Sequence, residues 1–572
     1  MNARAARRGP AGNSELFLGT LAGAIAIGLV LSLVGPVHAG TPGTAGDTTA
    51  DRELGQIDFT HNMFDFGGAA ALSGLSGVAV DSAGHLYVSD SINNRILGWT
   101  SAGAFANGDP AHLVIGQPDF YSYRCDDGTA AGDVDGTGAD SLCGPEGIAV
   151  DRAGNLYVAD TIDSLVLEFA SPFLSEVTRG QSAATVFGHR GSFVATSCGD
   201  GGSSASSLCD PRGVALDAAG NLYVADSGAS RVLEYNTPLN PSSGETGAGD
   251  TIADAAFGQN GIFGTSGCND GTAVGDVSGR GRDSLCGPVD VAIEANGDLY
   301  VSDTNNNRVL EYNTPLNPSS GEPGAGDTIA DNVFGQNGSF TTGAGDDGTG
   351  AGDVGGLGPD SLFEPRGLAA DAAGNLYVGD AGNSRLVEYN TPLNPSSGET
   401  GAGDAVADMV FGQDGSFTTA LCNGSDSDLV AGLGIVIDAS VLCSPAAVAL
   451  DPSGNLYAAD SDNSRMLVFD TPLNPSSGES GAGDSIADRE LGQTDLGHNM
   501  EDFGGAQALE LANPSSTNVT AANPAIDANG HLYVPGTVNS RVLGWTSASA
   551  FSNGAPAALV SRPARLLQLR LQ

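Results

Sequence analysis

The stretch GVALDAAGNLYVADSGASRVLEY at residues 213–235 decides the fold, because the chain spells close copies of it repeatedly. A second clear copy is DVAIEANGDLYVSDTNNNRVLEY at residues 290–312. Seven copies align on the carboxylate that ends their first apolar run, at Asp81, Asp151, Asp217, Glu294, Asp371, Asp451 and Asp527. These positions lie 66 to 80 residues apart. Such a period predicts repeated units that bury a shared core by packing against their neighbours.

Each copy has the pattern of short strands joined by turns. In the third copy, residues 214–217 and 221–226 are rich in aliphatic and aromatic side chains, and the Asp-x-x-Gly between them is typical of a type I turn. Residues 231–235 and 256–259 are predicted as a third and a fourth strand, the fourth ending at Gln259. After residue 50 there is no sustained helical periodicity. Four antiparallel strands per copy, repeated seven times, predict an all-β fold, the seven-bladed β-propeller.

The run P-x-G-V-A-V-D-x-x-G-N-L-Y-V-A-D-S-x-N-x-R-V-L, which most copies follow, resembles the NHL repeat. The resemblance covers residues 51–560 and implies a bacterial-type propeller protein that is secreted or attached to the surface. Two features depart from it: the inserts between strands are long, and the seventh copy has Pro535-Gly536 where the other copies end their second strand in Asp. At the level of the fold, the resemblance extends to calcium-dependent lactonases and lyases.

The chain is strongly acidic. It has 68 Asp and Glu residues against 22 basic residues, all of them Arg, and a formal net charge of −46. A surface of this charge repels nucleic acid and anionic lipid headgroups. We therefore expect no nucleic-acid partner, and a monomer with a solvated acidic surface.

The first 39 residues are typical of a targeting segment. Arg4, Arg7 and Arg8 precede an apolar run from Leu16 to Val34, and residues 37–39 offer a small-residue cleavage site. The run is also long enough for a membrane anchor, so both interpretations stay open. Both place the repeats outside the cytoplasm. The predicted organisation is residues 1–39 as signal peptide or anchor, 40–50 as linker, 51–560 as the propeller and 561–572 as an irregular tail.

All eight cysteines lie in the loop that follows the fourth strand of a copy, two in each of four loops. The expected pairs are Cys125 with Cys143, Cys198 with Cys209, Cys268 with Cys286, and Cys422 with Cys443. In the fifth copy, the equivalent positions are Gly345 and Phe363, so that both cysteines are missing together. Outside the cytoplasm this pattern predicts four local disulfides.

The same loops contain acidic stretches, such as GDVDGTGADS at residues 132–141. Asp133, Asp135 and Asp140 have the oxygen-rich, glycine-interrupted pattern of a calcium loop, and calcium is the one cofactor that the sequence suggests. However, Asp135 is replaced by Ser278 and Gly355 in other copies, and this favours a polar hairpin turn that uses Asp and Gly for their turn geometry.

An Asp and an Arg recur five residues apart around the end of the second strand. A carboxylate that meets loop amides and a nearby guanidinium is expected to stabilise the fold rather than to catalyse a reaction. The expected structural residues are Asp90, Asp160, Asp226, Asp303, Asp380, Asp460, Arg95, Arg231, Arg308, Arg385, Arg465 and Arg541.

Two segments compete for one place in the seventh sheet. A strand at residues 53–56 precedes the first copy, whereas the seventh copy supplies only three strands by Trp545. The N-terminal strand therefore completes the seventh sheet, or Ala558–Val560 does. Either arrangement removes an exposed sheet edge.

No catalytic constellation stands out. His61, His112, His189 and His498 are scattered, and Glu146 and Asp290 are the only acidic departures expected near the mouth of the central channel. The first hypothesis is thus an extracytoplasmic binding scaffold for an unknown protein or polysaccharide partner. The alternatives are a calcium-dependent hydrolase or lyase of the lactonase kind, with a metal in the central channel, and a calcium-stabilised surface adhesion protein.

Overall fold

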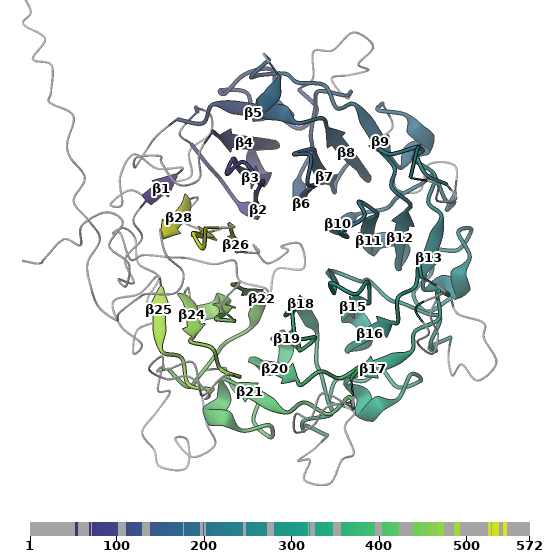
Figure 1. Ribbon diagram of the computed structural model, residues 1–572, viewed down its shortest axis with the longest axis vertical. Helices are drawn as coiled ribbons and strands as arrows, with labels where there is room; N and C mark the ends of the chain where they lie inside the picture. The colour runs from purple at the N-terminus through teal and green to yellow at the C-terminus, as the bar shows by residue number, and fades with distance from the viewer. Residues whose placement is uncertain are drawn as a thin grey trace, which may run out of the picture. The chain divides into compact units, whose positions relative to one another are not determined.

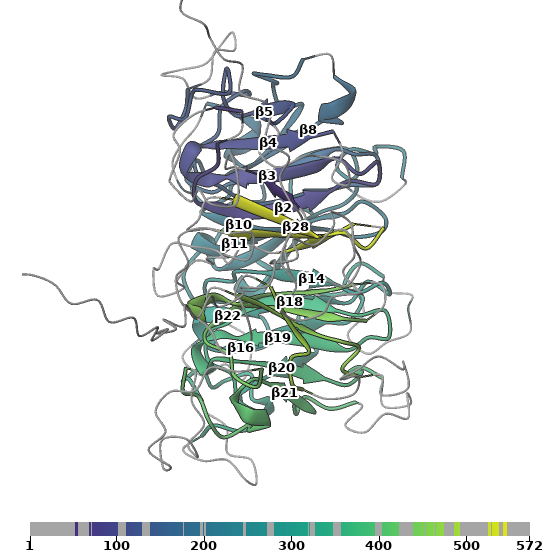
Figure 2. The ribbon, with the colours of Figure 1, turned by 90° about the vertical axis from the view of Figure 1, so that its left-hand side faces the viewer.

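Residues 52–545 form seven four-stranded antiparallel sheets around a common axis (Figures 1 and 2). The computed structural model describes residues 52–54, 68–69, 71–100, 110–127, 138–175, 177–194, 198, 202–243, 247–270, 279–317, 320, 326–346, 356–394, 403–422, 439–451, 454–463, 465–473, 485–491, 524–527, 529–536 and 541–545. Each sheet is one blade, numbered 1 to 7 in chain order of its innermost strand. The predicted seven-bladed propeller is confirmed.

Strands in the same place of each blade share their sequence pattern. The innermost strands are β2 (Leu75–Val80), β6 (Pro145–Val150), β10 (Pro211–Leu216), β14 (Val291–Ile293), β18 (Pro365–Ala370), β22 (Pro445–Leu450) and β26 (Ala525–Ile526). The second strands are β3 (Leu86–Asp90), β7 (Leu156–Asp160), β11 (Leu222–Asp226), β15 (Leu299–Asp303), β19 (Leu376–Asp380), β23 (Leu456–Asp460) and β27 (Leu532–Gly536).

The third strands are β4 (Arg95–Trp99), β8 (Leu165–Phe169), β12 (Arg231–Tyr235), β16 (Arg308–Tyr312), β20 (Arg385–Tyr389), β24 (Arg465–Phe469) and β28 (Arg541–Trp545). The outermost strands are β5 (Leu113–Ile115), β9 (Thr185–Phe187), β13 (Ala255–Phe257), β17 (Asn332–Phe334), β21 (Met409–Phe411), β25 (Arg489–Leu491) and β1 (Arg52–Leu54).

The helices in the described part of the chain are short 3₁₀ turns. Those between the second and third strands are η1 (Ser91–Asn93), η4 (Ser227–Ala229), η6 (Thr304–Asn306), η8 (Ala381–Asn383) and η10 (Ser461–Asn463). Those that follow an outermost strand are η3 (His189–Gly191), η5 (Gln259–Gly261), η7 (Gln336–Gly338) and η9 (Gln413–Gly415), and η2 (Pro172–Leu174) follows β8.

The outermost strands end earlier than predicted. The sequence suggested that the fourth strand of the third copy runs to Gln259, but β13 ends at Phe257. Gly258 has a φ of 80° and Gln259 a φ of 55°, so the extended backbone stops at the glycine and a 3₁₀ turn begins. The same Gly-Gln break ends β17 and β21.

The N-terminal strand completes blade 7. β1 pairs antiparallel with β28, with Leu54 opposite Val542, so blade 7 has the order β1-β28-β27-β26. Of the two strands that competed for this place, the N-terminal one occupies it. Ala558–Val560 lies outside the described residues. Strands from the two ends of the propeller thus close the sheet, which leaves no free edge at β28.

The core lies between neighbouring blades. One cluster combines Val232 and Phe257 of blade 3 with Leu299 and Tyr312 of blade 4, and equivalent clusters join the other described blades. The rings of Phe257 and Tyr312 meet edge to face, with centroids 4.9 Å apart. Because each sheet buries both faces against its neighbours, an isolated blade would expose most of its apolar side chains.

Hydroxyl groups also join the blades near the axis. Thr304 Oγ1 at the end of β15 donates to the carbonyl of Pro365 in blade 5 (2.8 Å), and Thr161 Oγ1 donates to Pro211 in blade 3 (2.8 Å). These bonds hold the first residues of successive inner strands in place. They position the axial cavity described below.

Candidate functional site

The repeated Asp and Arg residues form buried ion pairs at the end of the second strand. In blade 3, Arg231 Nε donates to Asp226 Oδ2 at 2.7 Å, and Cys209 N donates to Asp226 Oδ1. The terminal nitrogens of Arg231 donate to backbone carbonyls of Phe263 and Ser207 in the loops beside the sheet. Equivalent pairs at 2.6–2.7 Å are Asp90 with Arg95, Asp303 with Arg308, Asp380 with Arg385, and Asp460 with Arg465.

Each pair joins the second strand, the third strand and two loops. Burial raises the pKa of Asp226 to about 6, although the Arg231 guanidinium and the hydrogen bonds to the carboxylate act in the opposite direction. The side chain of Arg541 in blade 7 lies outside the described residues, and Pro535 stands opposite Val542 in that sheet.

Blade 2 lacks the Arg. Leu165 pairs with Asp160 where the other blades have Arg, and Asp163 stands where blades 1, 4, 5 and 6 have Asn. Burial raises the pKa of Asp160 well above its ordinary value, and the charge of Asp163 adds to this. Burial and the neighbouring Asp126 raise the pKa of Asp163 to about 8. Blade 2 thus holds one carboxyl group, that of Asp163, which favours the protonated state near neutral pH.

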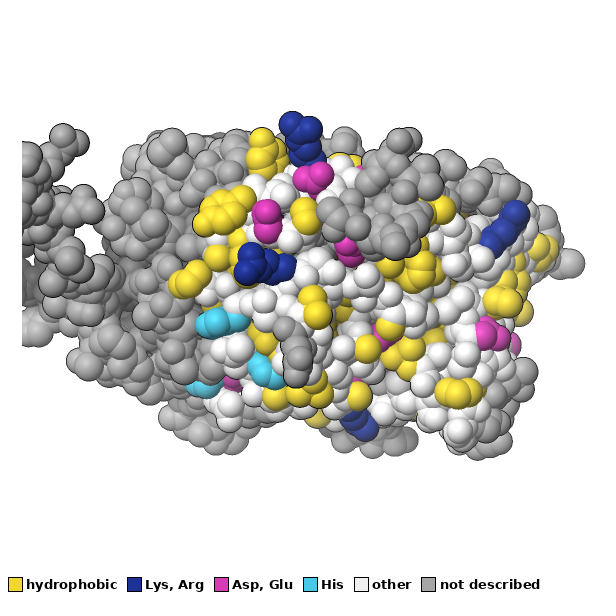
Figure 3. Space-filling model, turned by 90° about the horizontal axis from the view of Figure 1, so that it is seen from above, with side chains coloured by type: hydrophobic (Ala, Val, Ile, Leu, Met, Phe, Trp, Pro, Cys, Tyr) yellow, Lys and Arg dark blue, Asp and Glu magenta, His cyan; other side chains and the backbone are white. Residues whose placement is uncertain are grey.

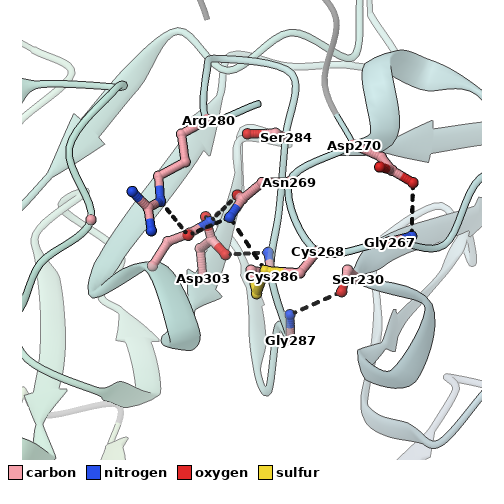
Figure 4. Close-up of a disulfide and its surroundings, with 12 residues drawn as sticks. Ser230, Gly267, Cys268, Asn269, Asp270, Arg280, Ser284, Cys286, Gly287 and Asp303 are labelled. Carbon is pink, nitrogen blue, oxygen red and sulfur yellow. Dashed lines mark hydrogen bonds between the residues drawn. A yellow bond between two sulfur atoms is a disulfide. The ribbon is translucent and has the colours of Figure 1, made fainter. Parts of the chain in front are cut away.

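The four predicted disulfides are confirmed: Cys125–Cys143, Cys198–Cys209, Cys268–Cys286 and Cys422–Cys443. Each lies beside the Asp at the end of the second strand, as Figure 4 shows for Cys268–Cys286. There the amide of Cys286 donates to Asp303 Oδ1 (2.6 Å), and Asn269 exchanges hydrogen bonds with Asn306 in the adjoining 3₁₀ turn. The disulfide therefore ties its loop to the same carboxylate that the Arg holds.

Of the proposed calcium ligands, only Asp140 is described, because Asp133 and Asp135 lie outside the described residues. Asp140 is buried, as are the equivalent Asp283 and Asp360 in other blades. In the described part of the chain, one close group of three metal-ligand side chains occurs, Cys125, Asp126 and Cys143, and its two sulfurs are joined as a disulfide. Sulfurs in a disulfide are not the thiolates that bind metals.

A cavity of about 60 Å³ lies on the axis, where the inner strands begin. Its lining comes from six blades: Ser76, Gly77, Val78, Gly147, Ile148, Arg212, Gly213, Val214, Val289, Asp290, Arg366, Gly367 and Ala446. The glycines let neighbouring backbones approach closely: a Cβ on Gly147 would lie 2.2 Å from the carbonyl oxygen of Arg212. Three charged side chains line this axial cavity: Arg212, Arg366 and Asp290.

Asp290 replaces the glycine of this position in blade 4. Its carboxylate accepts hydrogen bonds from Val291 N (2.9 Å) and, across the blade boundary, from Leu368 N (3.1 Å). Burial raises its pKa to about 6, although these two amides lower it. The strand that follows Asp290 is also short, since β14 has three residues where β10 and β18 have six.

Arg212 and Arg366 are both partly buried, and the charge of Arg212 affects the pKa of Arg366. The Arg366 side chain is 18% exposed, and its guanidinium lies 3.9 Å from the carboxylate of Glu364. Burial lowers the pKa of Arg366, Glu364 opposes this, and the charge of Arg212 adds to the lowering. The charged residues among the described lining are thus two arginines and one aspartate, and the carboxylates of Glu364 and Asp462 also act on Arg366. Guanidinium groups are suited to binding an anion.

Sequence reasoning had named Glu146 and Asp290 near the channel but had missed Arg212 and Arg366. Glu146 is half-buried beside the cavity, and its carbonyl accepts from Ser89 Oγ (3.0 Å). The signal that was missed is the residue between the Pro and the Gly that begin an inner strand. In blades 2, 3 and 5 this residue is charged, as Glu146, Arg212 and Arg366. The scattered histidines include His189, whose Nε2 bonds the carbonyl of Asp163 in blade 2.

The family comparison agrees with this geometry. The family model described as NHL repeat matches residues 72–99, 142–169, 208–235, 285–312 and 442–469, which end with the third strands of blades 1, 2, 3, 4 and 6. The chain is an NHL-repeat β-propeller protein. Within the NHL-repeat protein, blade 5 also keeps the Asp–Arg pair, and its residues 367–389 follow the same pattern as the matched copies.

The solved structures to which the NHL-repeat protein is similar have low sequence identity to it. A streptogramin B lyase is 9% identical with a TM-score of 0.42, over 84% of this chain and 95% of that one. Virginiamycin B lyase from Staphylococcus aureus is 8% identical with a TM-score of 0.40, over 84% and 96%. An extracellular domain from B. thetaiotaomicron is 11% identical with a TM-score of 0.40, over 82% and 39%. A comparison with curated proteins finds no match.

The disulfides indicate that the NHL-repeat protein is extracytoplasmic, since disulfides persist in oxidising compartments. Of the helices in the described ranges, none has the length and apolar character needed to cross a membrane. The apolar run from Leu16 to Val34 lies outside those ranges.

Proposed function

We propose that the protein is an extracytoplasmic binding scaffold that seats an anionic group of its ligand in the axial cavity, between Arg212 and Arg366. The observation that carries this proposal is the presence of both guanidinium groups in one cavity. The chain has only 22 basic residues and a net charge of −46, so two arginines at one place oppose the general charge of the molecule. On the rim viewed in Figure 3, basic side chains lie singly and apart from one another.

The chemistry of the two side chains supports this function. Guanidinium groups present planar pairs of donors that match carboxylate and phosphate oxygens. The backbone that carries them is rigid, because the inner strands of neighbouring blades touch at Gly147, Gly213 and Gly367. A rigid support lowers the entropy that is lost when a ligand binds.

The acidic surface restricts which ligands can reach the cavity. The negative potential of this surface repels extended polyanions. A site with two arginines stays open to a small anion or to a single anionic group of a larger partner. We propose a protein or polysaccharide partner that presents such a group, with no nucleic acid. We also propose that the protein acts as a monomer that is secreted or held by its N-terminal apolar segment.

Titration of the full chain with citrate and with inorganic phosphate, followed by calorimetry, tests this function. The wild-type protein should bind at least one of the two probes, and added salt should weaken the binding by screening. The Arg212→Gln/Arg366→Gln variant should lose at least tenfold in affinity. Arg152→Gln is the matched control, because Arg152 is exposed in the first turn of blade 2, away from the cavity. Equal affinity in the double variant, or no binding by the wild type, would overturn the proposal.

A further inference from the structure

The first turn of blade 4 departs from its equivalents in the other blades. In blades 2, 3, 5 and 6 the turn begins with Asp and has Asn four residues later, and the Asn Nδ2 donates to the Asp Oδ2 at 2.7–2.8 Å. In blades 1 and 7 a His Nδ1 takes the place of the amide, at 2.7 and 2.6 Å. Blade 4 has Glu294 and Asp298 instead, so that a carboxyl group stands where every other turn has a nitrogen.

Both carboxyl groups are buried. Glu294 is 9% exposed and Asp298 is 1% exposed. The oxygens of Asp298 are engaged by Thr314 N (2.7 Å) and by Asn296 Nδ2 (2.6 Å). Glu294 Oε1, by contrast, is buried without a hydrogen-bond partner. A buried carboxylate oxygen without a partner carries a desolvation cost that a bound cation would remove.

Glu294 also lines a cavity. A space of about 280 Å³ lies between the first turns of blades 4 and 5 and is lined by Glu294, Asn296, Asp298, Ala373, Gly374, Thr391, Leu393 and Asn394. Glu294 Oε1 would lie 3.0 Å from a Cβ on Gly374, so a side chain at this position would crowd the oxygen. The described lining residues provide two carboxylates, two side-chain amides and a hydroxyl, and none of them is basic.

Other carboxyl groups lie near this pair. Burial raises the pKa of Glu294 to about 7, and the charges of Asp298 and Asp371 add to this, while Asn296 opposes it. Burial raises the pKa of Glu311, on β16, to about 9, with contributions from Asp298, Asp331 and Glu294. A shared proton can hold the Glu294–Asp298 pair together, and a cation can do so with a larger gain because it neutralises both groups.

We propose that Glu294 and Asp298 bind a divalent cation of the calcium class in this blade 4–5 cavity. Carboxylate and amide oxygens without nitrogen or sulfur donors are the ligands that calcium prefers. Calcium takes six to eight oxygens, and the cavity has room for the waters that would complete its shell. The site lies at the first turns of the blades, whereas the disulfide loops and the axial arginines lie at the other ends of the inner strands, so it is independent of the proposed anion site.

The experiment compares thermal unfolding of the full chain at pH 7 with millimolar calcium and with EDTA. The Glu294→Asp/Asp298→Asn variant is the matched control, since it gives blade 4 the Asp and Asn that blade 3 has at Asp217 and Asn221. Glu294→Gln is the second variant, because its amide can donate to Asp298 in place of a shared proton. We expect calcium to raise the Tm of the wild type by several degrees and to leave the Tm of both variants unchanged. In EDTA, both variants should be as stable as the wild type.

Two outcomes would overturn the proposal. If calcium leaves the wild-type Tm unchanged, a shared proton alone holds the pair. If both variants keep the calcium-dependent shift, the ion binds elsewhere, for example in the loop that contains Asp133 and Asp135. Circular dichroism of the variants in EDTA shows that a lost response does not come from misfolding.

Discussion

The ring of Phe363 lies against Gly345, at the two positions where the loops into blades 2, 3, 4 and 6 carry a disulfide. A Cβ on Gly345 would be 2.7 Å from Phe363 Cδ2, and a Cβ on Gly382 would be equally close to the same ring. The amide of Phe363 donates to Asp380 Oδ1 (2.7 Å), as the second cysteine does in the other loops. An aromatic ring in a glycine-lined space therefore replaces the covalent bond.

The blade 5 loop should accept a fifth disulfide. Gly345 and Phe363 are 18 residues apart, the same separation as in Cys125–Cys143 and Cys268–Cys286. Gly345→Cys/Phe363→Cys should form the bond and stabilise the fold by up to about 3 kcal/mol, because the link constrains the unfolded chain. Mass spectrometry without reduction and urea unfolding measure the two effects. Gly345→Ala alone should destabilise, since its methyl group meets the Phe363 ring; a stable alanine variant would contradict this packing.

Blade 2 should make the stability of the wild type depend on pH. The pKa of Asp163 is raised to about 8 and that of Asp160 is also raised. A raised pKa means that the folded state binds the proton more tightly than the unfolded state does. The contribution is therefore complete below the ordinary Asp value, near 4, and is lost as the pH rises through about 8.

A repair of blade 2 should remove this dependence. Asp163→Asn/Leu165→Arg supplies the amide and the guanidinium that blades 1, 4, 5 and 6 have. We expect the Tm of this variant to rise relative to the wild type at pH 8, by a few degrees, and much less at pH 5. Thermal unfolding at both pH values measures this difference. Arg152→Gln is the control, because Arg152 is exposed. An equal Tm difference at both pH values would show that the acidic pair does not titrate in this range.

Removal of one guanidinium should cost more than removal of a whole ion pair. Arg231→Met leaves the Asp226 carboxylate buried without its cation and leaves the carbonyls of Phe263 and Ser207 without donors, a loss of about 3–5 kcal/mol. Asp226→Asn/Arg231→Met removes the charge as well and should recover part of that loss. Urea unfolding of the two variants measures the difference. If the single variant were the more stable, the pair would not hold the loops in the way that its hydrogen bonds indicate.

Closure of blade 7 should depend on the first strand. Deletion of residues 52–54 exposes the edge of β28, where Leu54 now pairs with Val542. We expect a lower Tm and concentration-dependent association, because an open strand edge pairs with other chains. Calorimetry and size-exclusion chromatography check this, and deletion of residues 561–572 is the control. An unchanged Tm after the first deletion would mean that a C-terminal strand takes the place.

The sequence alone determined the propeller, its seven blades and the disulfide pairs. A period that places the same apolar run and the same turn in each copy leaves few ways to bury those runs, and the joint loss of two cysteines at Gly345 and Phe363 identified partners by itself. These are properties of one repeat and its immediate neighbours, so local patterns were sufficient to predict them. The end of each outermost strand was misplaced by two residues, because the positive φ of Gly258 is not visible in an apolar pattern.

Only the tertiary structure decided which end of the chain closes the ring and which side chains meet on the axis. β1 and β28 are almost 500 residues apart, and the choice depends on hydrogen bonds between these distant segments. Arg212, Asp290 and Arg366 come from three blades, and Glu294 faces a cavity whose other wall belongs to blade 5. Sites of this kind arise where different repeats meet, and a pattern read along one repeat contains no information about the distance between them.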